Sequence, residues 1–310
     1  MTTRRDSIKL IGAAAAAAVI PGMACGRKPA EQNHEFVYCL NTSTIRGQER
    51  GLTGSIEIAG EAGYDAVELW VGEVQDYLEQ GNSLPELKSV IRASGVKVAG
   101  AIGFAPWIVD DDDQRQQGFR QMEEEMNLMA ELGCRRIAAP PAGFHHRDDL
   151  DYSKAAARYG KLLELGRRTG VMPHLEFWGA ARSLYNLSQA LYIAAATNDP
   201  DARILADVYH LFRGGSGFNG LRLVRGSAME IFHMNDYPGD VPREEQTDAH
   251  RVYPGDGAAP MEQILSELHQ MGGVKVLSLE LFNRDYWAQD ALEVARTGLT
   301  KMKDLVSRVT

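Results

Sequence analysis

The chain has 310 residues, of which 44% are hydrophobic and 24% charged, a balance typical of a soluble globular protein with a sizeable core. Its formal net charge is −9, and no cluster of Lys and Arg offers a positive face to phosphate groups, which argues against nucleic acid or anionic membrane as a partner. The length suits one large α/β barrel or two ordinary domains.

The first thirty residues differ in character from the rest. Arg4 and Arg5 precede an Ala-rich apolar run, and small residues follow it. The run is shorter than the roughly 20 apolar residues that a membrane-spanning helix needs. The pattern therefore predicts a twin-arginine export signal over residues 1–30, with an Ala-rich helix or a membrane anchor as the alternative. We expect a periplasmic or otherwise exported protein.

The three cysteines divide into two groups. Cys25 lies in a Met-Ala-Cys-Gly sequence that resembles a bacterial lipidation site, although Gly22 stands where a larger aliphatic residue is usual. A lipid anchor at Cys25 is therefore an open alternative, and it is the only membrane contact that we expect. Cys39 and Cys134 fall in or beside predicted strands, which favours buried thiols over a disulfide.

Eight short apolar runs, most of them followed by a longer segment with apolar residues three and four apart, fill the rest of the chain. This alternation is typical of βα units. Glycines before several runs are predicted to end helices in the left-handed conformation, among them Gly63 and Gly170. The runs cover residues 36–41, 66–71, 97–104, 136–140, 172–177, 204–209, 230–234 and 276–282.

This pattern predicts an α/β fold, a (β/α)8 TIM barrel, because parallel strands that are buried on both faces read as continuous apolar runs. No linker or change of composition divides residues 36–310, so we expect a single barrel domain after the export signal. A doubly wound open sheet is the alternative, but no Gly-rich phosphate loop follows the first run.

Four of the runs carry a possible metal ligand at or near their end: Glu176, Asp207, His233 and Glu280. The carboxyl ends of barrel strands surround the active site. One such carboxylate alone can simply pair with an arginine, but the set of four predicts a single metal site. Three carboxylates and one imidazole suit Mn²⁺ best, with Mg²⁺, Co²⁺ or Zn²⁺ as alternatives.

Seven short segments carry a resemblance to a known family: residues 39–41, 63–68, 175–177, 207–210, 232–233, 248–257 and 278–282. On these segments the chain resembles the xylose isomerase-like sugar isomerases and epimerases, and among them most closely the inosose isomerases. The resemblance extends over roughly residues 36–305. Its Arg-x-x-Pro-Gly-x-Gly element, which begins at Arg251, is specific to the superfamily in combination with the ordered Glu, Asp, His and Glu set, and it is not specific to one substrate.

The resemblance implies that Glu176, Asp207, His233 and Glu280 hold one divalent metal, and that Glu176 and Glu280 exchange protons with the substrate from opposite sides. A metal bridging a ketone oxygen and the adjacent hydroxyl would acidify the C–H bond between them. A carboxylate against that carbon can take the proton and return it to the adjacent carbon or to the other face. We expect an isomerase or epimerase of a small polyhydroxylated ketone, an inosose or a ketose, that works through an enediolate.

Other polar residues are expected to contact the substrate. By the family pattern His210 hydrogen-bonds a substrate oxygen, with the holding of a metal ligand as the alternative. Arg251 is expected to reach a substrate hydroxyl, with a solvated loop arginine as the alternative. Asn41 and Glu68, at the ends of the first two runs, are expected to line the pocket.

Aromatic residues near the strand ends could stack on the C–H face of a sugar or cyclitol, or could pack within the barrel. Among them we assign Trp107 and Trp178 to the substrate. His145 and His146 follow the fourth run, and a substrate contact there is left open. The four acids at 110–113 are interpreted as a solvated helix start and not as a cation site.

Two other functions remain as alternatives. A lyase of the same fold would remove the same kind of proton but expel a leaving group, acting on 3-keto-glycosides or as an inosose dehydratase. A non-catalytic periplasmic sugar-binding barrel is the second alternative, although binding a neutral sugar requires no cluster of carboxylates. The expected partner is a small sugar or cyclitol, and the sequence identifies no oligomer interface.

Overall fold

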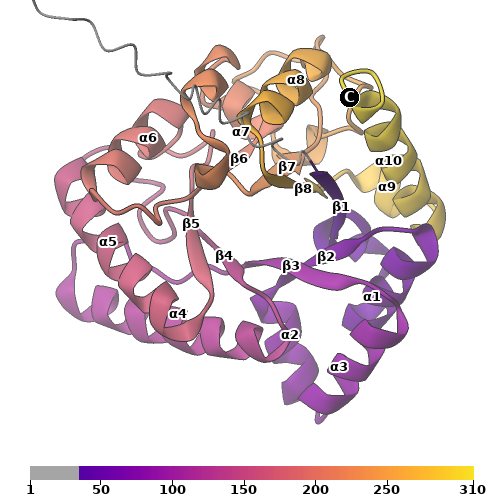
Figure 1. Cartoon of the computed structure of the whole chain (residues 1–310), viewed down its shortest axis with the longest axis horizontal. Helices are drawn as coiled ribbons and strands as arrows, with labels where there is room; N and C mark the ends of the chain where they lie inside the picture. Colours follow the sequence, from indigo (N-terminus) through magenta and orange to yellow (C-terminus); the bar gives the residue numbers. More distant parts are fainter. Residues whose placement is uncertain (1–34) are drawn as a thin grey trace, which may run out of the picture. The chain divides into compact units, whose positions relative to one another are not determined.

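Eight parallel strands pair in sequence order and close into a barrel, because β1 also pairs with β8 (Figure 1). The computed structural model describes residues 35–310. The predicted export signal and Cys25 lie outside the described residues and stay a prediction. The strands are β1 (Glu35–Asn41), β2 (Ala66–Trp70), β3 (Lys97–Ile102), β4 (Arg136–Ala139), β5 (Met172–Glu176), β6 (Ile204–Asp207), β7 (Ile231–Met234) and β8 (Val274–Leu279). The prediction of an eight-stranded barrel is confirmed.

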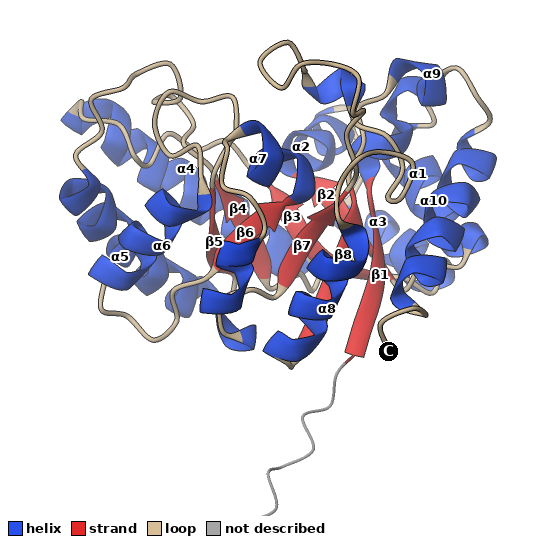
Figure 2. Cartoon of the chain, turned by 90° about the horizontal axis from the view of Figure 1, so that it is seen from above, coloured by secondary structure: helices blue, strands red, loops and turns tan. Residues whose placement is uncertain are grey.

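Helices surround the strands, and long loops gather at the end where the strands finish (Figure 2). Predicted helix ends agree with the backbone, since φ is 91° at Gly63 and 78° at Gly170. The acidic run begins a helix as predicted, with Asp111 accepting a hydrogen bond from the Gln114 N–H at 2.8 Å. The helices are α1 (Gly51–Ala62), α2 (Val71–Glu79), α3 (Leu84–Ala93), α4 (Asp112–Glu131), α5 (Tyr152–Thr169), α6 (Leu187–Ala196), α7 (Val208–Arg213), α8 (Met261–Met271), α9 (Arg284–Trp287) and α10 (Ala291–Val306).

The buried apolar residues form two clusters. The larger one joins the helices to the outer faces of the strands, and methionines of α4 such as Met122 and Met126 belong to it. The smaller one consists of strand residues, most of them small or β-branched, and it fills part of the barrel interior: Cys39, Ala66, Ala99, Ile102, Ala138, Leu205, Ile231 and Val276. Small side chains there leave room for polar groups inside the barrel.

Both cysteines in the described part of the chain, Cys39 and Cys134, are buried and free, as predicted. Among residues 35–310, none of the helices has the length and apolar character needed to cross a membrane.

Gly100 in β3 tests how tightly the barrel interior is packed around its polar groups. A Cβ atom there would lie 2.7 Å from Oε1 of Glu68 and 2.7 Å from Cδ1 of Ile231. We expect Gly100→Ala to destabilise the fold by about 1–3 kcal/mol, because both neighbours must move. Urea unfolding measures this change.

Gly160 is the matched control, because it lies within α5 and a Cβ atom there would meet nothing within 4 Å. Gly160→Ala should stabilise the fold by about 0.5–1 kcal/mol. Equal stability of the two variants would contradict the packing described here.

Candidate active site

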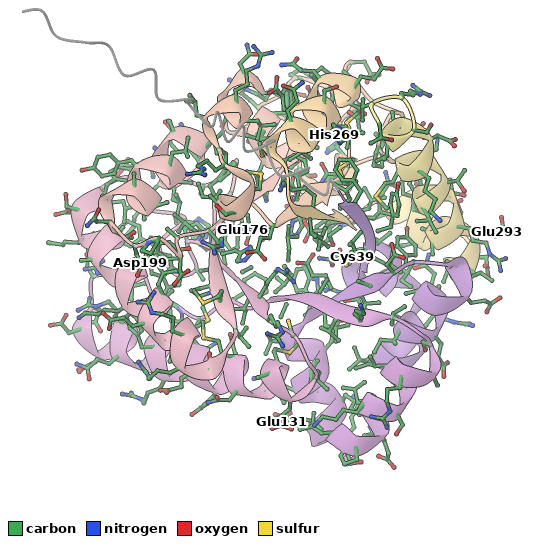
Figure 3. All side chains as sticks on the ribbon, viewed as in Figure 1. Cys39, Glu131, Glu176, Asp199, His269 and Glu293 are labelled. Atoms are coloured by element: carbon green, nitrogen blue, oxygen red, sulfur yellow. The ribbon has the colours of Figure 1, made fainter. Side chains whose placement is uncertain are left out.

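The four predicted metal ligands lie where β5 to β8 finish. Glu176 is the last residue of β5, Asp207 is the last residue of β6, and Glu280 directly follows β8. Asp207 is the register partner of His233 in β7. Figure 3 marks Glu176 on the inner side of the ring of strands. Closure of the barrel therefore brings the four residues to one end of its interior.

Three of these residues form a compact cluster. One ligand atom each from Asp207, His233 and Glu280 lies within 4.8 Å of the other two, and all three side chains are buried. Nδ1 of His233 is 3.1 Å from Oε2 of Glu280 and 3.7 Å from Oδ2 of Asp207. Glu176, the fourth predicted ligand, is outside this group of three but lines the same pocket as Glu280.

Glu68 orients the imidazole of His233 by contacting Nε2, the ring nitrogen that does not face Asp207 and Glu280. Its Oε2 lies 2.9 Å from Nε2 of His233, and it accepts hydrogen bonds from Ser278 Oγ at 2.7 Å and from Asn41 Nδ2 at 3.0 Å. A carboxylate beside Nε2 favours the proton on that nitrogen. Burial lowers the pKa of His233, but the charges of Glu280 and Glu68 outweigh it and raise that pKa, so a metal bound at Nδ1 would replace the proton that faces the two acids. This is the orientation that a metal-binding histidine requires.

Arg251 joins the carboxylates of the cluster. Its Nη1 donates to Oδ2 of Asp207 at 2.8 Å and to Oε2 of Glu280 at 2.7 Å, while Nη2 donates to Oδ1 of Asp248 at 2.7 Å. Asn235 adds a hydrogen bond to Oδ2 of Asp207 at 3.0 Å. Arg251 is 1% exposed, so its charge offsets that of the acids in a site with little water.

The hydrogen bonds around His210 select one tautomer. The backbone N–H of Gly179 donates to Nδ1 at 3.2 Å, and Nε2 lies 3.3 Å from Nη2 of Arg251. Because a backbone N–H can only donate, Nδ1 is the acceptor and Nε2 carries the proton. Nη2 of Arg251 is also a donor, so its approach to Nε2 is a contact and not a hydrogen bond. Burial lowers the pKa of His210, and the neutral ring can therefore donate to an oxygen atom in the pocket.

The pKa values of two carboxyls in the site shift in opposite directions. Burial raises the pKa of Glu176 to about 8; His233 opposes this shift, and Glu280 and Asp207 add to it. Burial also acts to raise the pKa of Asp207, but the positive charge of Arg251 above all outweighs it, and that pKa is held at about 2. A cation near Glu176 would favour its charged form.

The donor atoms fit a divalent metal. Oε2 of Glu176 is buried and makes no hydrogen bond to any residue that the structure describes, and Nδ1 of His233 faces carboxylate oxygens of Glu280 and Asp207. Buried polar atoms without partners are rare in proteins, and a bound ion can supply the missing partner. Carboxylate oxygens and one imidazole nitrogen are ligands that Mn²⁺, Mg²⁺, Co²⁺ and Zn²⁺ accept.

A pocket of about 380 Å³ opens beside the cluster. Of the residues assigned to the substrate, His210, Arg251 and Trp178 line it, as do Glu176 and Glu280. Aromatic side chains and two histidines complete much of its wall: Trp70, Phe104, Phe282, His145 and His146. The volume is within the range of about 300–1,000 Å³ that is typical of small-molecule sites.

Three residues assigned to the substrate lie elsewhere. Asn41 and Glu68 are buried beneath the pocket, where Asn41 also donates to Oε1 of Glu280 at 3.2 Å, so they support other side chains. Trp107 is 0% exposed and donates from Nε1 to the Pro140 carbonyl at 2.8 Å, with its ring against Tyr159. For these three, the expectation of a place in the pocket wall is corrected: they lie under or outside it.

Asp248 and Asn235 belong to the site but were not predicted from the sequence. Asp248 lines the pocket and holds Arg251. Asn235 connects two elements, because it donates to Asp207 and accepts the backbone N–H of Tyr209 at 2.9 Å. Both lie within or beside segments that carry the family resemblance, and the position of Asp248 three residues before Arg251 was the one available signal.

Asp236 fixes the loop that carries Arg251. Its carboxylate is 0% exposed and accepts four backbone N–H groups at 2.8–3.1 Å, from Tyr237, Gly255, Gly257 and Ala259. The backbones of Asp236 and Val252 also exchange two hydrogen bonds, at 2.9 and 3.0 Å. Asp236 is therefore a positioning residue for Arg251.

Comparisons with known proteins agree with this fold. The model of a family described as xylose isomerase-like TIM barrels matches residues 56–305. An inosose isomerase of Bacillus velezensis is 26% identical over 279 residues, which cover 87% of this chain and 97% of that protein. A 3-dehydro-D-guloside 4-epimerase of Escherichia coli is 23% identical over 203 residues, 60% of this chain and 72% of that protein. The solved structure of the IOLI protein with a bound zinc atom superimposes on this chain with a TM-score of 0.81 at 24% identity. The match covers 88% of this chain and 99% of the IOLI chain, and it shows that the two share a fold.

Asp236→Asn tests the anchoring of the loop. An amide NH₂ would face backbone N–H groups that need an acceptor, and each buried polar group without a partner costs about 1–3 kcal/mol. We expect faster hydrogen exchange across residues 248–259, measured by mass spectrometry. Asp290→Asn is the control, because Asp290 is an exposed helix cap that accepts two N–H groups and Asn caps equally well. Unchanged exchange in Asp236→Asn would contradict the positioning role.

Glu68→Gln tests the orientation of His233. Loss of the carboxylate beside Nε2 should weaken Mn²⁺ binding about 10- to 100-fold, because groups that hold a metal-binding histidine contribute that much to affinity. Titration calorimetry measures the change. Glu125→Gln is the matched control, since Glu125 is also a buried glutamate, 4% exposed, but lies in α4. Equal Mn²⁺ affinity of the two variants would disprove the role of Glu68.

Proposed function

The chain belongs to the family of xylose isomerase-like TIM barrels, and on that basis we propose that it is a metal-dependent isomerase or epimerase of a small polyhydroxylated ketone, an inosose or a ketose. The observation that carries this proposal is the pair Glu176 and Glu280, two buried carboxylates that line one pocket together with Arg251 and His210. The inosose isomerase and the epimerase among the relatives support the reaction class.

In this proposal Glu176, Asp207, Glu280 and Nδ1 of His233 hold one divalent metal, with Mn²⁺ as the first candidate and Mg²⁺, Co²⁺ or Zn²⁺ as the others. A metal held there would acidify the C–H bond beside the substrate carbonyl and would stabilise the charge that develops on the oxygens. Arg251 stays between Asp207 and Glu280, where it keeps both carboxylates in place.

The proton transfer belongs to the two glutamates. One of them, as the carboxylate, removes the proton from the carbon next to the carbonyl, and the electron pair of that bond forms the enediolate. In an epimerase the other glutamate returns a proton to the opposite face of the same carbon. In an isomerase the proton goes to the adjacent carbon, which was the carbonyl carbon, and the hydroxyl proton passes from the first oxygen to the former carbonyl oxygen.

Neighbouring side chains bind and orient the substrate in this scheme. Nε2–H of His210 donates to a substrate oxygen, because Nδ1 is already occupied by the Gly179 N–H. Trp178, two residues after Glu176, offers a ring face to the C–H face of the substrate. Export through residues 1–30, with a lipid at Cys25 as an option, is a separate part of the proposal and would bring the enzyme to a periplasmic substrate.

Solvent deuterium exchange tests the reaction. Protein loaded with Mn²⁺ is incubated in D₂O with a panel of ketoses, inososes and 3-keto-glycosides, and exchange at the carbon next to the carbonyl is followed by NMR. We expect exchange that stops on chelation and returns with Mn²⁺. Glu176→Gln and Glu280→Gln should each lower the rate at least about 10²- to 10⁴-fold, whereas Glu125→Gln should not.

The products separate the reaction types. Isomers and epimers keep the mass of the substrate, whereas a lyase releases a fragment or water, which mass spectrometry detects. Exchange that continues unchanged in both Gln variants would disprove the role of the glutamates. Absence of exchange with every compound, in protein that holds stoichiometric metal, would favour a sugar-binding barrel.

A further inference from the structure

Four aromatic side chains form a continuous arc along one side of the pocket, which we call the aromatic arc: Phe282, Trp70, Phe104 and Trp178. The ring centroids are 6.0 Å apart from Phe282 to Trp70, 5.3 Å from Trp70 to Phe104, and 6.0 Å from Phe104 to Trp178. The polar residues His210, Asp248 and Arg251 also line the pocket. The pocket therefore combines a wall of apolar rings with a group of charged and hydrogen-bonding side chains.

Polar partners fix the orientation of Trp70 in the arc. Its Nε1 donates to Oδ1 of Asn41 at 2.8 Å. The guanidinium of Arg46 lies 3.9 Å from the ring centroid, and Nε of Arg46 is itself held by Oε1 of Glu73 at 3.0 Å. A cation on one face and a hydrogen bond at the edge hold the indole in place before any ligand arrives.

Phe104 forms the exposed part of the arc. Its side chain is 42% exposed, which is unusual among the large apolar side chains of the described residues. Isolated exposed phenylalanines are common on protein surfaces, but Phe104 adjoins two other aromatic rings at a pocket. Apolar surface gathered at such a place marks a binding site.

The arc offers more stacking positions than one small polyol uses. Trp178 and Phe282 each lie two residues after a proton-transferring glutamate, so they flank the reacting end of the substrate. Trp70 and Phe104 lie between them in the arc, with Phe104 at the open side. Both rings line the pocket, so a ligand ring whose centroid lies about 4.5–7 Å from theirs would stack on them beside the ring that reacts.

We infer that Trp70 and Phe104 form a subsite for a second, flat-faced ring that is joined to the polyhydroxylated ketone. The inference rests on the proposed function and extends its substrate class: the polyhydroxylated ketone carries a ring substituent, as in a keto-glycoside. The common chemistry of the substituent is an apolar ring face, which an aryl group or a second pyranose provides.

Three ligands that differ only in the substituent test the subsite: the methyl, phenyl and glucosyl glycosides of 3-ketoglucose. Their affinities for the full chain loaded with Mn²⁺ are measured by titration calorimetry. We expect at least one of the two ring-bearing ligands to bind about three- to tenfold more tightly than the methyl glycoside, the gain of one stacked ring pair. Whether phenyl or glucosyl has the advantage identifies the substituent as aryl or sugar.

Phe104→Ala should lower the ratio of the affinity for the ring-bearing ligand to that for the methyl glycoside until it is close to one. Tyr192→Ala is the control, because Tyr192 is also an exposed aromatic residue, 52% exposed, and lies outside the pocket. Equal affinity of the wild-type protein for all three ligands would overturn the inference, and so would a preference that survives in Phe104→Ala.

Deuterium exchange in the same samples separates this inference from the proposed function. Exchange into all three ligands without a ring preference would disprove the subsite and leave the proposed function standing. A ring preference that Phe104→Ala removes, without exchange into any ligand, would support the subsite and count against proton transfer.

Discussion

The concentration of negative charge at one end of the barrel is the constraint on which the rest of the site depends. Asp207, Glu280 and Glu176 are buried around His233, and carboxylates that are removed from water repel one another unless cations and hydrogen bonds compensate. Arg251 supplies one such charge through its contacts with Asp207 and Glu280, although it is almost completely buried itself. A divalent metal would supply the rest, since Oε2 of Glu176 has no hydrogen-bond partner among the described residues.

Support for this charged group comes from both sides. Below it, Glu68 orients His233 and is held by Ser278, in a layer of the barrel where Gly100 leaves no space for a larger side chain. Above it, Asp236 anchors the loop that delivers Arg251. The barrel interior and one loop thus cooperate to hold a small set of atoms, and this is why residues without any contact to a substrate are expected to affect metal binding.

The fold could be predicted because apolar runs and glycine-terminated helices reflect local physical rules. The convergence of Asp207, His233 and Glu280 followed from the barrel, in which consecutive strand ends must meet. The sequence does not show how deep in the barrel a side chain near a strand end lies. Asn41 and Glu68 lie at or near strand ends, yet their side chains face inward one layer below the pocket. The direction of a side chain after a strand was equally inaccessible, so Trp178 lines the pocket while Trp107 packs against Tyr159. Asp248 begins a single 3-10 turn, Asp248–His250, between longer loops, and so short an element has no periodicity that reveals which residues face a site.

A single divalent metal held by four side chains, among them His233 through Nδ1, is central to the proposed function. Anomalous diffraction from crystals grown with Mn²⁺ tests it most directly. We expect one strong peak within about 2.0–2.3 Å of Nδ1 of His233 and of carboxylate oxygens of Glu176, Asp207 and Glu280. A peak bound through Nε2, a peak that excludes Glu176, or no peak at this end of the barrel at saturating Mn²⁺ would contradict it.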